Sequence, residues 1–112
     1  MSKEYDNYIA AKKNYDDTAA AVQTLIDQLA AFASPLIKNW KDCYVELYGS
    51  ATPMETVSTL QRVQGNNVPN PAEIQQAMLR HRESQKLGHA AWTSLSEQER
   101  KELVHPPWLK RR

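Results

Sequence analysis

The stretch that decides the fold is residues 3–33, KEYDNYIAAKKNYDDTAAAVQTLIDQLAAFA. Two series of side chains recur in it every seven residues, the second starting three residues after the first, as in a helix with one apolar stripe. The first series is Tyr8, Tyr15, Val22 and Leu29, and the second is Ala11, Thr18, Leu25 and Phe32. The stretch contains no glycine or proline, which favours helix. It predicts one long amphipathic helix over 3–33, about 45 Å long.

The stripe of this helix changes character along its length. Its first half is tyrosine and small residues, whereas its second half is aliphatic and ends at Phe32. Tyrosine tolerates both apolar packing and water. We therefore expect the second half to be the true core and the first half to make a wetter, weaker contact. Because the helix is longer than a globule of about 27 Å diameter, part of the stripe should need a partner.

A second long helix is predicted over 71–93. Asn70-Pro71-Ala72-Glu73 matches a capping box with proline at the first helical position. Apolar and small residues behind it keep 4-3 spacing as far as Trp92. One part of that face carries small side chains, which indicates tight helix–helix packing: Ala77, Ser84, Gly88 and Ala91. We expect the two long helices to pack as a helical hairpin.

The segment between the long helices, 34–69, is predicted to contain short elements. Ser34-Pro35 marks either a new helix or a kinked continuation of the first one. Thr52-Pro53-Met54-Glu55 matches a capping box that could open a short helix. Residues 64–67, Gln-Gly-Asn-Asn, predict a turn.

Residues 43–48 leave the secondary structure of the middle segment open. Apolar and other residues alternate there as in a strand, but the same residues could extend a helix. The β-branched residues 56–59 also alternate, so a small β-hairpin with 43–48 is one possible structure.

The C-terminal part is predicted to hold a short helix and a tail. Ser96-Glu97-Gln98-Glu99 is a third capping box and begins a helix over 96–104. His105-Pro106-Pro107 ends this helix, because neither proline can continue it, and 105–112 form the tail. The chain as a whole is predicted to be a single, mainly α-helical domain over 1–112.

Part of the chain resembles small helical proteins of unknown function encoded in bacterial and prophage genomes. The pattern is the helix start at Asn70-Pro71-Ala72-Glu73-Ile74 followed by Ala91-Trp92, Leu95, Glu97, Arg100, Leu103 and Pro106-Pro107. The resemblance covers residues 70–107. It implies a bacterial or phage origin and a non-enzymatic role, and it carries over no functional residues.

Composition bounds the class of protein. The 112 residues are 41% hydrophobic and 24% charged, which is typical of a folded globular chain. No apolar run approaches the roughly 18 residues of a membrane span, and the N-terminus has no signal-peptide pattern, so we expect no membrane partner. Cys43 is the only cysteine, which suits a reducing compartment. We expect the protein in the bacterial host cytoplasm or in a virion.

The sequence offers no recognisable catalytic or metal-binding motif. His81 and His89 are eight residues apart, too far for one metal on a single helix, and Cys43 has no histidine near it in sequence. Three glycines cannot build a phosphate-binding loop. We therefore expect no enzyme, no cofactor, no metal and no small-molecule substrate.

The favoured function is protein–protein interaction or assembly, as in a phage particle component or a phage-encoded accessory protein. The partner is another copy of the chain or a different assembly subunit. Trp108 and Leu109 follow two stiffening prolines, so Trp108 is either a peg into a neighbour or a side chain folded onto its own core. The expected interface residues are Tyr8, Tyr15, Val22, Leu25, Leu29, Phe32, Trp92, Trp108 and Leu109.

The alternative function is a nucleic-acid-binding accessory factor. Net charge is only +1, but residues 71–112 carry eight Lys or Arg against five Glu, whereas residues 1–32 carry three Lys against five acidic residues. Basic side chains near two tryptophans could contact phosphates and bases. The residues of this alternative are Arg80, Arg82, Lys86, Lys110, Arg111 and Arg112.

Overall fold

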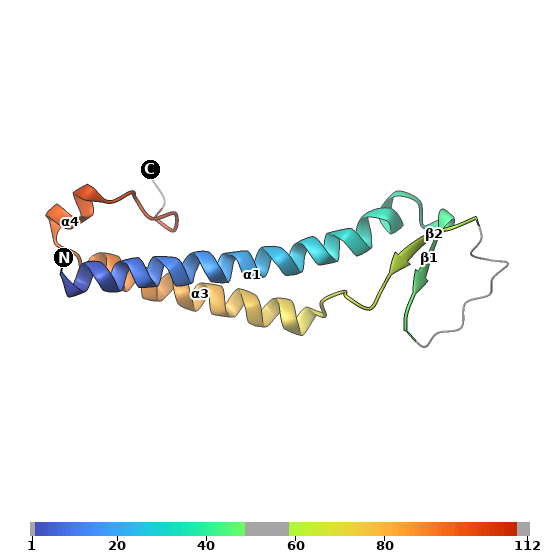
Figure 1. Cartoon of the computed structure of the whole chain (residues 1–112), viewed down its shortest axis with the longest axis horizontal. Coiled ribbons are helices and arrows are strands. Elements are labelled where there is room, and N and C mark those ends of the chain that lie inside the picture. The colour runs from blue at the N-terminus through green and yellow to red at the C-terminus, as the bar shows by residue number, and fades with distance from the viewer. Residues whose placement is uncertain (1, 49–58, 110–112) are drawn as a thin grey trace. The chain divides into compact units, whose positions relative to one another are not determined.

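The computed structural model describes residues 2–48 and 59–109. Its elements are α1 (Lys3–Asn39), the 3-10 turn η1 (Trp40–Asp42), β1 (Cys43–Glu46), β2 (Gln61–Gln64), α3 (Pro71–Thr93) and α4 (Glu97–Glu102) (Figure 1). The mainly α-helical fold with two long helices is confirmed. The chain forms two compact units, described separately below: unit 1 is Met1–Val22 with Gln75–Arg112, and unit 2 is Gln23–Ile74. The single domain over 1–112 stays a prediction.

Helix α1 begins at a serine cap and is longer than expected. The hydroxyl of Ser2 accepts a hydrogen bond from the backbone N–H of Tyr5 at 3.0 Å, which satisfies one free donor of the first turn. The expected end at residue 33 is wrong, because the helix continues through Pro35 to Asn39. A proline inside a helix removes one backbone hydrogen bond. Pro35 lines a hollow together with Val63 of β2, as described below.

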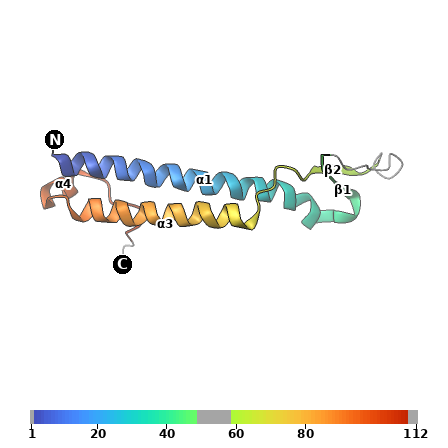
Figure 2. The same cartoon turned by 90° about the horizontal axis from the view of Figure 1, so that it is seen from below.

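Helix α3 has the bounds that its capping box predicts. The Asn70 side chain accepts from the N–H of Glu73 at 2.8 Å, and the Glu73 carboxylate accepts from the N–H of Asn70 at 3.4 Å. In unit 1 the helices α1 and α3 lie side by side, as both views show (Figures 1 and 2). They run antiparallel, since Tyr8 meets Trp92 at a ring-centroid distance of 5.3 Å and Thr18, farther along α1, meets Ser84. The predicted packing of the two long helices is confirmed.

The short helix α4 also starts at its predicted capping box. The Ser96 hydroxyl accepts from the N–H of Glu99, and the Glu99 carboxylate accepts from the N–H of Ser96. The helix spans 97–102 rather than 96–104, and Pro106 in the following tail is buried. The tail therefore folds back on unit 1.

The core of unit 1 is aromatic and reverses the expected order along α1. Tyr8 is only 3% exposed, and it packs with the buried Trp92 and Leu95. The second half of α1, expected to be the true core, is only half-buried: Val22, Leu25, Ile26, Leu29 and Phe32. The physical reason is that different segments of the chain cover the two halves of α1. Residues 92–109 pack over Tyr8, whereas the described residues of unit 2 offer the second half of α1 two short strands and a loop.

The middle segment contains strands, but they do not form a hairpin. β1 and β2 are parallel, with Cys43 opposite Gln61 and Glu46 opposite Gln64. A hairpin requires antiparallel strands, so the hairpin alternative does not describe the parallel pairing of β1 with β2. The turn after β2 is present at Asn66 and Asn67. The proposed helix after Thr52 and most of 56–59 lie outside the described residues.

Candidate interaction surface

Trp108 is folded onto its own unit rather than held out as a peg. Its ring lies 4.9 Å from that of Tyr15 in an edge-on arrangement and 6.4 Å from that of Tyr8. Leu109 packs against the same cluster. Of the expected interface residues, Tyr8 and Trp92 are buried in the core of unit 1, so neither is available to a neighbour, whereas Trp108 packs against that core and is half-buried. The assignment of Tyr8 and Trp92 as interface residues is corrected to core.

A buried polar contact joins the two helices of unit 1. The Thr18 hydroxyl lies 2.7 Å from the Ser84 hydroxyl and 3.0 Å from Nδ1 of His81. Ser84, 2% exposed, also bonds the His81 carbonyl at 2.7 Å. These bonds satisfy polar groups that would otherwise be costly to bury, and they match α1 to α3 in one register. Ser84 is therefore a helix-pairing residue, shielded from any substrate.

The second half of α1 presents an incompletely covered apolar face in unit 2. We call the half-buried Leu25, Leu29, Phe32 and Leu36 the unit-2 stripe; their spacing of four, three and four residues keeps them on one side of the helix. Tyr8 is the only buried residue among the described residues of α1. A helix this apolar usually has a buried face, but the residues that the structure describes leave this stripe half-covered.

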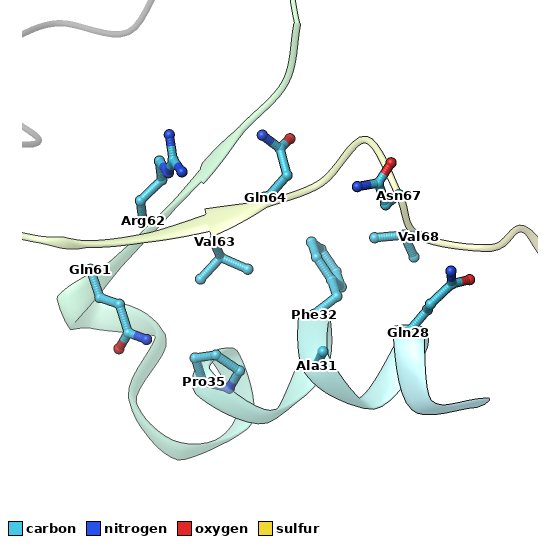
Figure 3. A pocket seen from close by; sticks show the side chains of 10 residues that line it. All are labelled: Gln28, Ala31, Phe32, Pro35, Gln61, Arg62, Val63, Gln64, Asn67 and Val68. Carbon is cyan, nitrogen blue, oxygen red and sulfur yellow. The ribbon is translucent and has the colours of Figure 1, made fainter. Parts of the chain in front are cut away.

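One end of the stripe borders a hollow between α1 and β2. Figure 3 shows Phe32 and Pro35 of α1 facing Val63 of β2, while Arg62 and Gln64 point to the other side of the strand. Val63 is the buried residue of this contact, at 4% exposure. The hollow measures about 320 Å³, and its polar lining is mainly amides: Gln28, Gln61, Gln64 and Asn67. Its described lining residues include no carboxylate or imidazole side chain.

Large apolar side chains that the sequence reasoning did not select are exposed in unit 2. Ile37 is 82% exposed, Trp40 66% and Tyr48 85%, and Val45 and Leu47 are also exposed. Isolated exposed apolar residues are ordinary, but five within twelve residues of sequence are typical of an interaction surface. The available signal was Trp40, an aromatic residue directly before the charged pair Lys41-Asp42.

The helical stretch Lys3–Asp42 is long and apolar enough to cross a membrane by length and composition alone. The absence of a membrane partner therefore stays a prediction. The apolar stretch was overlooked because Gln23, Asp27 and Gln28 interrupt it in sequence. Gln23 and Asp27 lie on the side of the helix away from the unit-2 stripe, so the segment is amphipathic.

The basic residues of the nucleic-acid alternative are separated by the structure. Arg82 and Lys86 line one groove on unit 1, together with His89 and Trp108. Arg80 does not line this groove, and its guanidinium bonds Gln76 at 3.4 Å. Lys110, Arg111 and Arg112 lie outside the described residues. His89 was missed as a groove residue, although its spacing of seven from Arg82 places both on one helix face.

Two titratable groups of unit 1 are shifted by their surroundings. Burial raises the pKa of Tyr8, and the negative charge of Asp16 adds to this. Hydrogen bonds from the Ser2 hydroxyl and, less strongly, from the Ser96 backbone lower the pKa of Glu99. Glu99 therefore links the N-terminal cap of α1 to the capping box of α4. Within the described residues, no cluster of three His, Cys, Asp or Glu side chains could hold a metal ion.

The Glu99 link predicts a loss of stability in acid. A carboxyl group with a lowered folded pKa stabilises the fold above its ordinary pKa, and this contribution is lost as pH falls through the folded value. Glu99→Gln should therefore lower the melting temperature modestly at pH 7 and reduce the further loss between pH 5 and pH 3. Thermal melts followed by circular dichroism measure this. Glu102→Gln, an exposed carboxylate of the same helix, is the control, and equal pH profiles for both variants would contradict the link.

No protein-family model, curated protein or solved structure matches the chain. The fold and surfaces define a mainly α-helical protein with a small parallel sheet and an unfinished apolar helix face.

Proposed function

We propose that this protein is a helical assembly protein that pairs with a second copy of itself through the unit-2 stripe. The observation that supports this most directly is that Leu25, Leu29, Phe32 and Leu36 line one side of α1 and none of them is buried. Spacing of four and three is the pattern of helix–helix seams. A single stripe of this kind is self-complementary about a two-fold axis, as most homodimer interfaces are.

The energetic case rests on the apolar area still exposed. Fully burying a leucine or phenylalanine side chain stabilises by about 1.5–3 kcal/mol. The four residues of the stripe are half-buried already, so pairing recovers part of that amount from each chain. Exposed Ile37 and Trp40 follow directly after the stripe and extend the apolar surface that a partner can cover.

A protein partner fits this helix better than a lipid bilayer. Asp27 would cost about 2.5–3.5 kcal/mol at the centre of a spanning helix. Gln23 donates to Asp27 at 2.8 Å, so one side of the helix is polar. A helix lying on a membrane surface usually carries Lys or Arg on its polar side, but the sequence has none between Lys13 and Lys38. A role in a bacterial or phage assembly stays a prediction.

Light scattering on the purified chain tests the proposal. We expect a mass of at least twice the 12.8 kDa of one chain, and Leu29→Asp should return it to the monomer mass by placing a charge in the seam. Ala30→Asp adds the same charge one residue away at an exposed position and should keep the larger mass. A strict monomer for the unaltered chain, or a Leu29→Asp variant that remains folded at the larger mass, would overturn the proposal.

A further inference from the structure

We propose that a groove on unit 1 binds single-stranded nucleic acid. The groove measures about 910 Å³, which is within the range of ligand-binding clefts. It lies on α3 beside the folded-back tail. Its lining includes Arg82, Gln85, Lys86, His89, Trp108 and Leu109.

The charge of the groove is one-sided. Arg82 and Lys86 occupy successive turns of α3, and none of the described residues that line the groove is acidic. Neither side chain forms an ion pair within residues 2–48 and 59–109; the pairs formed there use Lys12, Lys13 and Arg62. Both positive charges are therefore free to meet a ligand's phosphates.

The remaining lining residues suit a base rather than an inorganic ion. Trp108 and His89 are aromatic, and single-stranded nucleic acid is held by aromatic side chains together with positive charge along the backbone. The Gln85 amide adds a donor and an acceptor at the same groove.

The shape of the groove disfavours an acidic protein strand. Its wall on α3 is helical, so the backbone N–H and C=O groups there are already paired, and an extended peptide cannot add to it as a strand. A nucleic-acid strand needs no backbone pairing of that kind, because phosphate charge and base stacking provide the contacts.

The experiment is fluorescence anisotropy with a labelled oligo-deoxythymidine strand at several salt concentrations. We expect binding at low salt that weakens as salt rises. Arg82→Gln/Lys86→Gln should flatten the slope of log affinity against log salt by about 1.4, because each phosphate contact on a single strand contributes about 0.7. Arg80→Gln/Lys101→Gln removes the same charge outside the groove and should leave the slope nearly unchanged. Circular dichroism confirms that both variants fold.

Three outcomes would overturn the inference. One is absence of binding at low salt, and another is an equal effect of the two double variants. The third is tighter binding of poly-glutamate with the same dependence on Arg82 and Lys86, which would assign the groove to an acidic protein segment. Leu29→Asp should not change oligonucleotide affinity, so failure of this site and failure of the assembly proposal remain distinguishable.

Discussion

Trp92→Ala is expected to lower the free energy of unfolding by about 3–5 kcal/mol, the usual cost of truncating a large buried aromatic side chain. Trp92 is 7% exposed, and its ring centroid lies 5.3 Å from that of Tyr8 and 5.7 Å from that of His105. The substitution removes the largest side chain of the unit 1 core and leaves a cavity that the surrounding helices cannot fill. Small domains are stable by only about 5–15 kcal/mol, so this is a large share of the total.

Urea unfolding followed by circular dichroism measures the Trp92 effect. Trp40→Ala is the matched control, because it makes the same substitution at a side chain that is 66% exposed. The control should change stability by less than about 0.5 kcal/mol. Comparable losses in the two variants would contradict the placement of the core around Tyr8 and Trp92. The unfolding should be measured at low protein concentration, so that self-association does not add to the apparent stability.

The helices could be predicted from local patterns alone. α3 has the bounds that its capping box and 4-3 spacing indicate, and α4 starts at the predicted serine. The capping box and the 4-3 spacing are local signals, because each lies within a few residues of the helix end or the helix face that it predicts. Ser34-Pro35 left open whether the first helix ends or continues, because proline is a local signal that can stop or kink a helix, and α1 continues to Asn39.

The position of the core could not be predicted from residue types. Leucine and phenylalanine rank above tyrosine in apolar character, so the second half of α1 looked like the core. Which half becomes covered depends on where the tail returns, and the tail returns over Tyr8. The strand pairing could not be predicted either. Alternation of residues in β1 indicates a strand, but it does not indicate which segment pairs with that strand or in which direction.

The candidate sites were predicted in part. The unit-2 stripe follows from the heptads, because spacing alone decides which residues share a helix face. The groove could not be predicted in this way, because it forms only when Trp108 lies beside Arg82 and Lys86. The two prolines before Trp108 stiffen the chain but do not indicate in which direction it continues. Exposed Trp40 and Tyr48 were missed because exposure depends on the absence of a covering element.

Gly88→Leu is expected to destabilise unit 1 by about 2 kcal/mol, although leucine favours helix over glycine by nearly 1 kcal/mol. The small residues of α3 were predicted to admit a neighbouring helix backbone, but at Gly88 the neighbour is a side chain. A Cβ atom at Gly88 would lie 2.8 Å from Cη2 and 3.1 Å from Cζ2 of Trp108. The indole ring is rigid, so a larger residue must push Trp108 away from Tyr15.

A double-mutant cycle separates the steric effect from helix propensity. In the Trp108→Ala background the space beside residue 88 is open, so Gly88→Leu should reverse sign and stabilise the fold by about 1 kcal/mol. Urea unfolding of the four proteins gives the coupling between the two positions, which we expect to be about 3 kcal/mol. If Gly88→Leu has the same effect with and without the indole, the tail does not rest on α3 at Gly88. The groove proposed for nucleic acid would then lose the wall that Trp108 provides.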